Sequence, residues 1–154
     1  MTEILQQQIL TDKLARLLKG NFAAVKLCLD LVFIAHVWDD LYDKDRERTG
    51  EDISNAFRIA LVEIPENPFY IQNLSDLRPL MMNVILQWQD ANVLEHGNDH
   101  DKHMAYMLRA GIVQVISYCA YLIGGVEYAK EVGPDIRRLY EEGLQDFLKE
   151  FENA

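Results

Sequence analysis

The sequence is short of the residues that mark several common classes of protein. Only two cysteines, Cys28 and Cys119, occur among its 154 residues. Both lie inside apolar helical patterns, so we expect buried free thiols and no disulfide framework. Free thiols are typical of a reducing compartment, which favours a cytoplasmic location. The sequence contains no CxxC pair, glycine-rich phosphate loop or serine nucleophile elbow, so the chemistry of those motifs is not expected.

Basic residues are also scarce. Lys and Arg number 15 against 25 Asp and Glu, so the formal net charge is -10. This excess of carboxylates repels the phosphate backbone of nucleic acids, and we expect no non-specific binding to DNA or RNA. A phosphate-bearing small molecule is still compatible with this charge, because a bound divalent cation can bridge it to the protein.

Long uncharged apolar stretches are missing as well. The N-terminus has no basic segment followed by an apolar one, so we expect no signal peptide. The longest uncharged run, residues 110–126, contains glycine and polar side chains. It falls short of the roughly 20 apolar residues that a membrane-spanning helix needs. We therefore expect no membrane span and interpret this run as a core helix.

Helical periodicity is what the sequence does contain. Apolar residues recur at three- and four-residue intervals, and glycine and proline fall between the periodic segments. No segment has the alternation that is typical of a strand. The pattern predicts one all-α domain over residues 1–154, a bundle of five to seven helices. The expected helices cover residues 3–19, 22–45, 53–64, 76–95, 99–124 and 135–151, with a short piece at 126–132.

The helix expected at about 22–45 is the central one. Leu27, Leu31 and Trp38 share one of its faces, and the opposite face begins with Phe22 and Val25. Because both faces are apolar, we expect this helix to be buried, with the others packed around it. The opposite face ends in polar side chains, which we expect to point into a cleft: His36, Asp39, Asp40 and Asp43.

Three of these residues, Asp39, Asp40 and Asp43, form an acidic cluster that is a candidate metal site. Carboxylates one helical turn apart repel each other unless a cation neutralises their charge. Mg²⁺ and Mn²⁺ favour carboxylate oxygens together with water and substrate phosphates, and His36 lies one turn earlier in register. In the alternative interpretation the cluster is structural, and an arginine neutralises it. The candidate arginines are Arg46, Arg48 and Arg109.

The segment around the acidic cluster resembles a known family. AHVWDDLYDKDRERTG is similar to the first aspartate-rich motif (DDxxD) of the trans-isoprenyl diphosphate synthases, where arginines and a glycine follow the motif. The resemblance covers about twenty residues, and a second aspartate-rich motif is not found. It implies that Asp39, Asp40 and Asp43 bind Mg²⁺ that holds a substrate diphosphate. By position, Arg46 and Arg48 stand near the family's phosphate-binding arginines.

Other polar residues are candidates for a second wall of this site. Asn83, Gln87 and Asp90 form a polar stripe on an otherwise apolar helix, and we expect His100 to point inward from the next helix. The stripe is equally typical of a solvated face. Arg109 interrupts an apolar helix, where it either pairs with a buried carboxylate or binds a phosphate.

Three functional hypotheses remain. The first is a small divalent-metal-dependent helical protein that binds, hydrolyses or transfers a phosphate- or diphosphate-bearing small molecule. The second is a non-enzymatic acidic helical accessory or oligomerisation protein, such as a viral or mobile-element protein, whose acidic cluster is structural. The third rests on His100-Asp101, which resembles the metal-binding pair of HD-type metallohydrolases. A homo-oligomer is compatible with all three.

Overall fold

The computed structural model describes residues 2–152, and every regular element in that range is helical. This confirms the all-α fold class. The chain forms two compact units, Met1–Leu74 and Ser75–Ala154, so the boundary falls at the start of helix α6 (Leu74–Leu94). The expectation of a single domain stays a prediction.

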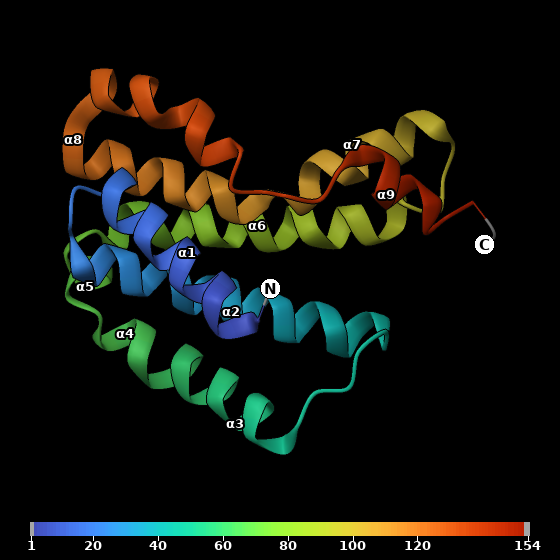
Figure 1. Ribbon diagram of the computed structural model, residues 1–154, viewed down its shortest axis with the longest axis horizontal. Helices are drawn as coiled ribbons and strands as arrows, with labels where there is room; N and C mark the ends of the chain where they lie inside the picture. The colour runs from blue at the N-terminus through green and yellow to red at the C-terminus, as the bar shows by residue number, and fades with distance from the viewer. Residues whose placement is uncertain (1, 153–154) are drawn as a thin grey trace. The chain divides into compact units, whose positions relative to one another are not determined.

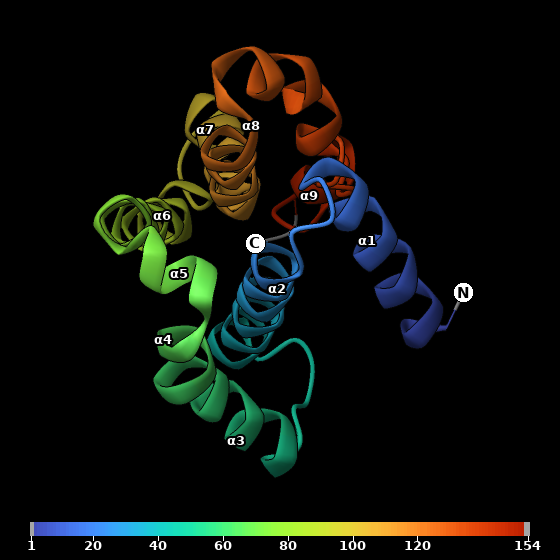
Figure 2. The same ribbon diagram turned by 90° about the vertical axis from the view of Figure 1, so that its left-hand side faces the viewer.

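The first unit is organised around α2 (Phe22–Asp43), the helix expected at 22–45. In Figure 2, α2 lies between α1 on one side and the segments from α3 to α5 on the other, and it contacts α1, α3 and α5. The remaining elements of this unit are α1 (Glu3–Leu17), α3 (Gly50–Arg58), a π-helix η1 (Ile59–Glu63), α4 (Ile64–Glu66) and α5 (Pro68–Gln72).

Local chemistry sets both ends of α2. The Asn21 side chain accepts a hydrogen bond of 3.1 Å from the Ala24 N–H and so caps the helix just before its predicted start at residue 22. At the other end Lys44 adopts a left-handed conformation, and its N–H donates to the Asp40 carbonyl. Two-sided burial is confirmed in the middle of the helix but is wrong at its ends, where Phe22 and Trp38 are exposed.

A chain of ion pairs ties α2 to η1. Lys26 donates to Asp30, which is buried, over 2.7 Å, and lies 3.4 Å from Glu63. Glu63 in turn pairs with Arg58 at 3.2 Å. The hydrogen bond to Asp30 and the charges of both carboxylates outweigh desolvation and raise the pKa of Lys26. Lys26 therefore stays charged, which keeps Asp30 from being an unpaired buried charge.

Asn67 joins α5 to α2. Its side-chain oxygen accepts hydrogen bonds from the N–H groups of Phe69 and Tyr70, which caps α5. Its amide nitrogen donates 2.9 Å to the carbonyl of Ala23, in the first turn of α2. Asn67 is buried, and one side chain thus satisfies the end of one helix and holds it to another.

The second unit contains α6, α7 (Asp99–Arg109), α8 (Gly111–Arg137) and α9 (Leu144–Lys149). Its core brings together α6, α7 and α9 through the buried side chains of Ala91, Ala105 and Phe147. The final helix expected at 135–151 is wrong in extent, because α8 continues to Arg137 and a non-helical segment precedes α9. Each of the two cysteines is a buried free thiol, as predicted.

Glu142 anchors the segment between α8 and α9. The Tyr106 hydroxyl donates to the Glu142 carbonyl over 2.7 Å, and the Tyr140 hydroxyl donates to the Glu142 carboxylate over 2.7 Å. Burial, followed by this hydrogen bond, raises the pKa of Tyr140 well above its usual range. Tyr140 is therefore a neutral donor at any physiological pH.

Helix α8 is divided at Gly125. This residue has φ 82° and ψ -177°, a combination that essentially only glycine adopts. The two arms of α8 turn back on each other at this point (Figure 1). Among the described helices, α8 is the one that is long and apolar enough to cross a membrane by length and composition. The break at Gly125 leaves neither arm with the roughly 20 residues that a straight span requires.

The first arm of α8 packs closely against α6. A Cβ atom at Gly111 would lie 2.8 Å from Val84 Cγ1, so glycine is what allows this approach. One turn further along each helix, the side-chain amides of Gln87 and Gln114 bond to each other, with N···O distances of 3.5 and 3.2 Å. The polar pair is thus satisfied within the contact between the two helices.

Candidate functional site

The acidic cluster lies at the C-terminal end of α2, where negative charge is unfavourable. The helix dipole places partial negative charge at this end, and the cluster adds three carboxylates there. Asp39 and Asp40 are half-buried, whereas Asp43 is exposed. The expected cleft therefore does not extend to Asp43. A cation is needed to offset the repulsion between these carboxylates and the negative end of the helix.

Arg48 supplies that cation. Its Nε donates a 2.6 Å hydrogen bond to Asp40 Oδ2, and its Nη1 lies 3.9 Å from Asp52. The side chains of Arg48 and Asp40 are only 11% and 16% exposed, so this pair is far better shielded from water than an ordinary surface ion pair. Arg46 instead pairs with Glu3 of α1 at 2.6 Å. In this geometry both arginines bind carboxylates of the chain.

His36 lies one turn before the cluster. Its side chain reaches the surface, yet the surrounding atoms remove enough water that desolvation lowers the pKa of His36. The positive charge of Arg48 lowers this pKa further, against an opposing effect of Asp40 and Asp39. The imidazole is therefore neutral at pH 7, which is the form that binds metals.

The side chains predicted to bind metal are not gathered into one coordination site. Within residues 2–152, no group of three or more His, Cys, Asp or Glu side chains is arranged so that it could hold a metal ion. The physical reason at Asp40 is its partner, since Arg48 stands where a cation would have to approach. A metal ion could bind Asp40 only if Arg48 moved away from this carboxylate.

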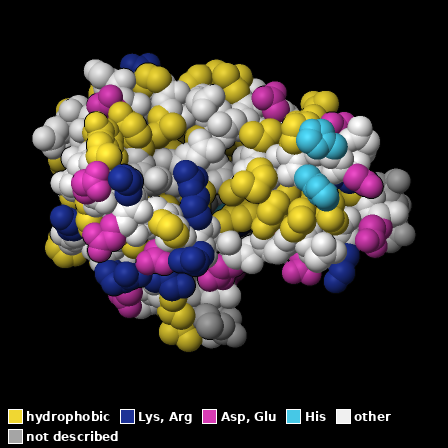
Figure 3. Space-filling model, turned by 90° about the horizontal axis from the view of Figure 1, so that it is seen from above, with side chains coloured by type: hydrophobic (Ala, Val, Ile, Leu, Met, Phe, Trp, Pro, Cys, Tyr) yellow, Lys and Arg dark blue, Asp and Glu magenta, His cyan; other side chains and the backbone are white. Residues whose placement is uncertain are grey.

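The residues predicted for a second wall lie in the second unit. The side-chain amide of Gln87 is hydrogen-bonded to that of Gln114, and Asn83 and Asp90 are exposed on α6. His100 is exposed too, so the expectation that it points inward is wrong. Ala105, the buried residue of α7, marks the inner side of this helix. His100 precedes it by five residues, a rotation of about 140° around the helix axis, so His100 lies on the outer side. Figure 3 shows histidine side chains at the surface.

A buried ion pair lies between α6 and α7, and it gives Arg109 a different partner from the predicted one. Arg109 Nε donates to Glu95 Oε2 over 3.0 Å, and Nη2 donates to the same oxygen and, over 3.0 Å, to Asn92 Oδ1. His96 lies 3.7 Å from the other Glu95 oxygen. The Arg109 and Glu95 side chains are 12% and 5% exposed. Arg109 thus pairs with a buried carboxylate, although that carboxylate belongs to Glu95 rather than to the acidic cluster.

A sequence signal for this pair exists in hindsight. Glu95 ends an apolar helix just before Gly97, and Arg109 is the only charged side chain between Lys102 and Glu127. Isolated charges of opposite sign inside apolar segments are typical of buried pairs.

Comparison of the chain with protein-family models, with curated proteins and with solved structures gives no match.

Proposed function

We propose that this protein is a non-enzymatic helical assembly protein that associates with a second copy of itself through α3 and η1. The observation that carries the proposal is an uncovered apolar ridge, formed by Phe57, Leu61 and Val62. The first two side chains are 63% and 71% exposed. The Arg48–Asp40 pair supports the same hypothesis, because it gives one carboxylate of the acidic cluster a partner within the chain.

The ridge follows from how α3 packs in the first unit. α3 is strongly amphipathic, yet none of its residues is buried, and Ile59, at the start of η1, is the first buried residue of this segment. The half-buried residues of α3 are Asp52, Ile53, Asn55 and Ala56. Phe57 lies just beyond the edge of this packed side, where it is exposed. The wider turn of η1 then sets Leu61 almost directly in line with Phe57. Apolar side chains exposed together mark interaction sites.

A second copy is the partner that this ridge fits. In a two-fold antiparallel arrangement, Phe57 of one copy meets Leu61 of the other, and the same contact repeats across the axis. The charged neighbours Arg58 and Glu63 pair with each other within the copy, 3.2 Å apart. The ridge therefore brings little unbalanced charge to the axis, despite the net charge of -10.

The oligomeric state tests this proposal. We expect light scattering on the size-exclusion eluate of the full chain to show a dimer whose population grows over a roughly hundredfold range of concentration. Phe57→Ser with Leu61→Ser should give a monomer, with stability changed by about 0.5 kcal/mol or less because both side chains are exposed. Val93→Ser, which changes an exposed apolar residue of the second unit, is the matched control and should stay dimeric. A wild-type monomer throughout, or a dimer that survives both serines, would overturn the proposal.

A metal-dependent role in binding, hydrolysing or transferring a phosphate-bearing molecule is the second candidate. It is favoured by the three carboxylates that share the last turns of α2, two of them half-buried, beside a neutral His36. In that role Mg²⁺ or Mn²⁺ would displace Arg48 from Asp40, and Arg48 would turn to the phosphate. The ion would supply charge neutralisation and activation of the leaving group.

Thermal unfolding with and without Mg²⁺ separates the two candidates. For an assembly protein we expect millimolar Mg²⁺, with or without pyrophosphate, to leave the Tm unchanged. The Tm of the double variant Asp39→Asn with Asp43→Asn should then be equally insensitive to Mg²⁺. Asp146→Asn, which removes an exposed carboxylate elsewhere, is the control. A Tm that rises with Mg²⁺ in the wild type but not in the double variant would favour the metal site instead.

A further inference from the structure

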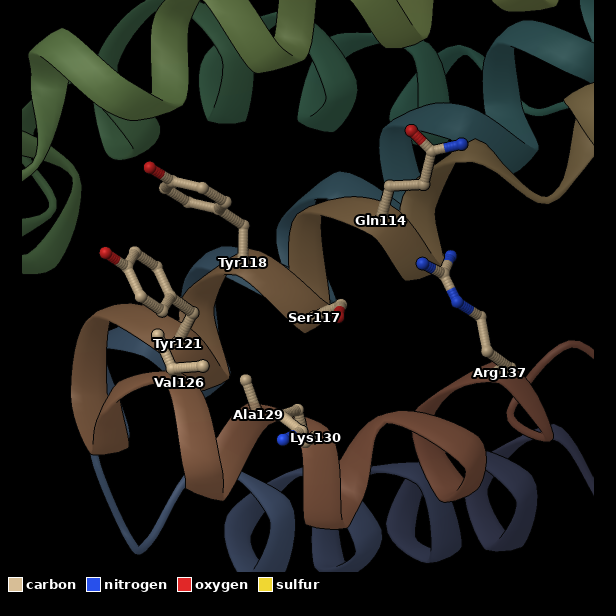
Figure 4. A pocket seen from close by; sticks show the side chains of 8 residues that line it. All are labelled: Gln114, Ser117, Tyr118, Tyr121, Val126, Ala129, Lys130 and Arg137. Carbon is tan, nitrogen blue, oxygen red and sulfur yellow. The ribbon is translucent and has the colours of Figure 1, made fainter.

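The two arms of α8 face each other across an open groove (Figure 4). Gln114, Ser117, Tyr118 and Tyr121 line it from the first arm, at the spacing of a single helix face. Val126, Ala129, Lys130 and Arg137 line it from the second arm. The groove has a volume of about 430 Å³, and it exists because Gly125 turns the helix back on itself.

The lining of this groove is basic although the chain as a whole is acidic. It contains Lys130 and Arg137, but no Asp or Glu. Lys130 is 3.4 Å from Glu127 on its own helix, and the Tyr118 hydroxyl donates to Asp76 over 3.4 Å. The carboxylates that contact these two lining residues are therefore already engaged. The guanidinium of Arg137 makes no hydrogen bond or ion pair within residues 2–152.

Arg137 and Gln114 also border a second hollow, of about 400 Å³. Met107, Ala110 and Val113 give this hollow an apolar wall. Figure 4 shows the Arg137 side chain directed from the second arm towards Gln114 on the first. Arg137, a cation without a partner in the described part of the chain, thus stands where the groove meets a second hollow that has an apolar wall. Such an arrangement suits a molecule with a charged head and an apolar body.

We propose that this groove binds a small amphiphilic anion, a phosphate or carboxylate on an apolar chain. The guanidinium of Arg137 donates two parallel hydrogen bonds to the head group, as arginine does with planar or tetrahedral anions. Lys130 adds positive charge from the same arm. The apolar body lies against Met107, Ala110 and Val113. The site belongs wholly to the second unit and is independent of the assembly proposed for α3 and η1.

Calorimetric titration of the full chain with octyl phosphate at low ionic strength tests this site. We expect saturable binding that Arg137→Gln weakens about tenfold or more, the loss expected for one charge-assisted contact. Arg138→Gln is the matched control, because the adjacent Arg138 is exposed and pairs with Asp135 at 2.8 Å outside the groove. That variant should bind as the wild type does, and both variants should keep the wild-type Tm.

Two further ligands separate the contributions of head and body. Inorganic phosphate lacks the apolar chain and octanol lacks the charge, so both should bind more weakly than octyl phosphate. Absence of binding by octyl phosphate would overturn the proposal. So would an equal loss in Arg137→Gln and Arg138→Gln, which indicates non-specific charge attraction, or equal binding of inorganic phosphate, which leaves the apolar hollow without a role.

Discussion

Arg109→Met is expected to lower the free energy of unfolding by about 3–5 kcal/mol, the cost of removing one partner from a buried ion pair. The loss arises because Glu95, which is 5% exposed, keeps its charge in a site that has lost its cation. Asn92 also loses the guanidinium that donates to it. Urea denaturation measures the effect as a lower midpoint with an unchanged slope.

Two further variants show whether the pairing is responsible. Arg109→Met combined with Glu95→Leu removes both charges and should recover most of the loss, since an apolar pair of similar volume often replaces a buried ion pair without penalty. Arg138→Met removes an exposed arginine from an ion pair and should change stability by about 0.5 kcal/mol or less. A loss below about 1 kcal/mol in Arg109→Met would contradict the structural role assigned to the pair.

Gly125→Ala should destabilise the second unit by about 1–3 kcal/mol, because its backbone conformation excludes any residue with a Cβ atom. Nothing lies within 4 Å of the position that this Cβ would take, so the cost comes from the backbone and not from a steric clash with a neighbour. Circular dichroism during thermal unfolding measures the lower Tm. An alanine at 125 also favours a straight α8, which would open the groove between its arms.

Gly50→Ala is the matched control for this substitution. A Cβ there also meets nothing within 4 Å, but Gly50 is the first residue of helix α3 and its φ is not positive. Alanine should therefore be neutral or stabilise the helix by up to about 1 kcal/mol. A loss at position 125 without a loss at position 50 would establish that the turn between the arms is required. A Gly125→Ala variant as stable as the wild type would show that it is not.

The sequence could predict those parts of the fold that depend on local chemistry. The central helix begins at Phe22 and α7 begins at Asp99, the residues at which the sequence predicts a helix to start, and an asparagine caps each of them. Caps and helical periodicity act over a few residues, so they can be recognised without knowing the tertiary structure. The burial of the middle of α2 follows from its composition in the same way.

The candidate site depends on contacts that no local pattern encodes. Periodicity places the carboxylates of Asp39, Asp40 and Asp43 near one another, but it does not show that the following loop returns Arg48 to Asp40, eight residues away. Arg109 and Glu95 are fourteen residues apart and meet only because the chain turns between α6 and α7. Likewise, the pattern of α3 identifies an apolar face at Phe57 and Leu61 but not whether anything covers it.

Asn67 has a consequence for the order in which the first unit opens. A helix of five residues such as α5 has no stability of its own in water, so its hydrogen bonds last only while its cap is held. The cap is held by the Ala23 carbonyl of α2. The amide protons of α5 and those at the beginning of α2 should therefore exchange with solvent in one cooperative opening, in which the long helix loses its first turn when the short one melts.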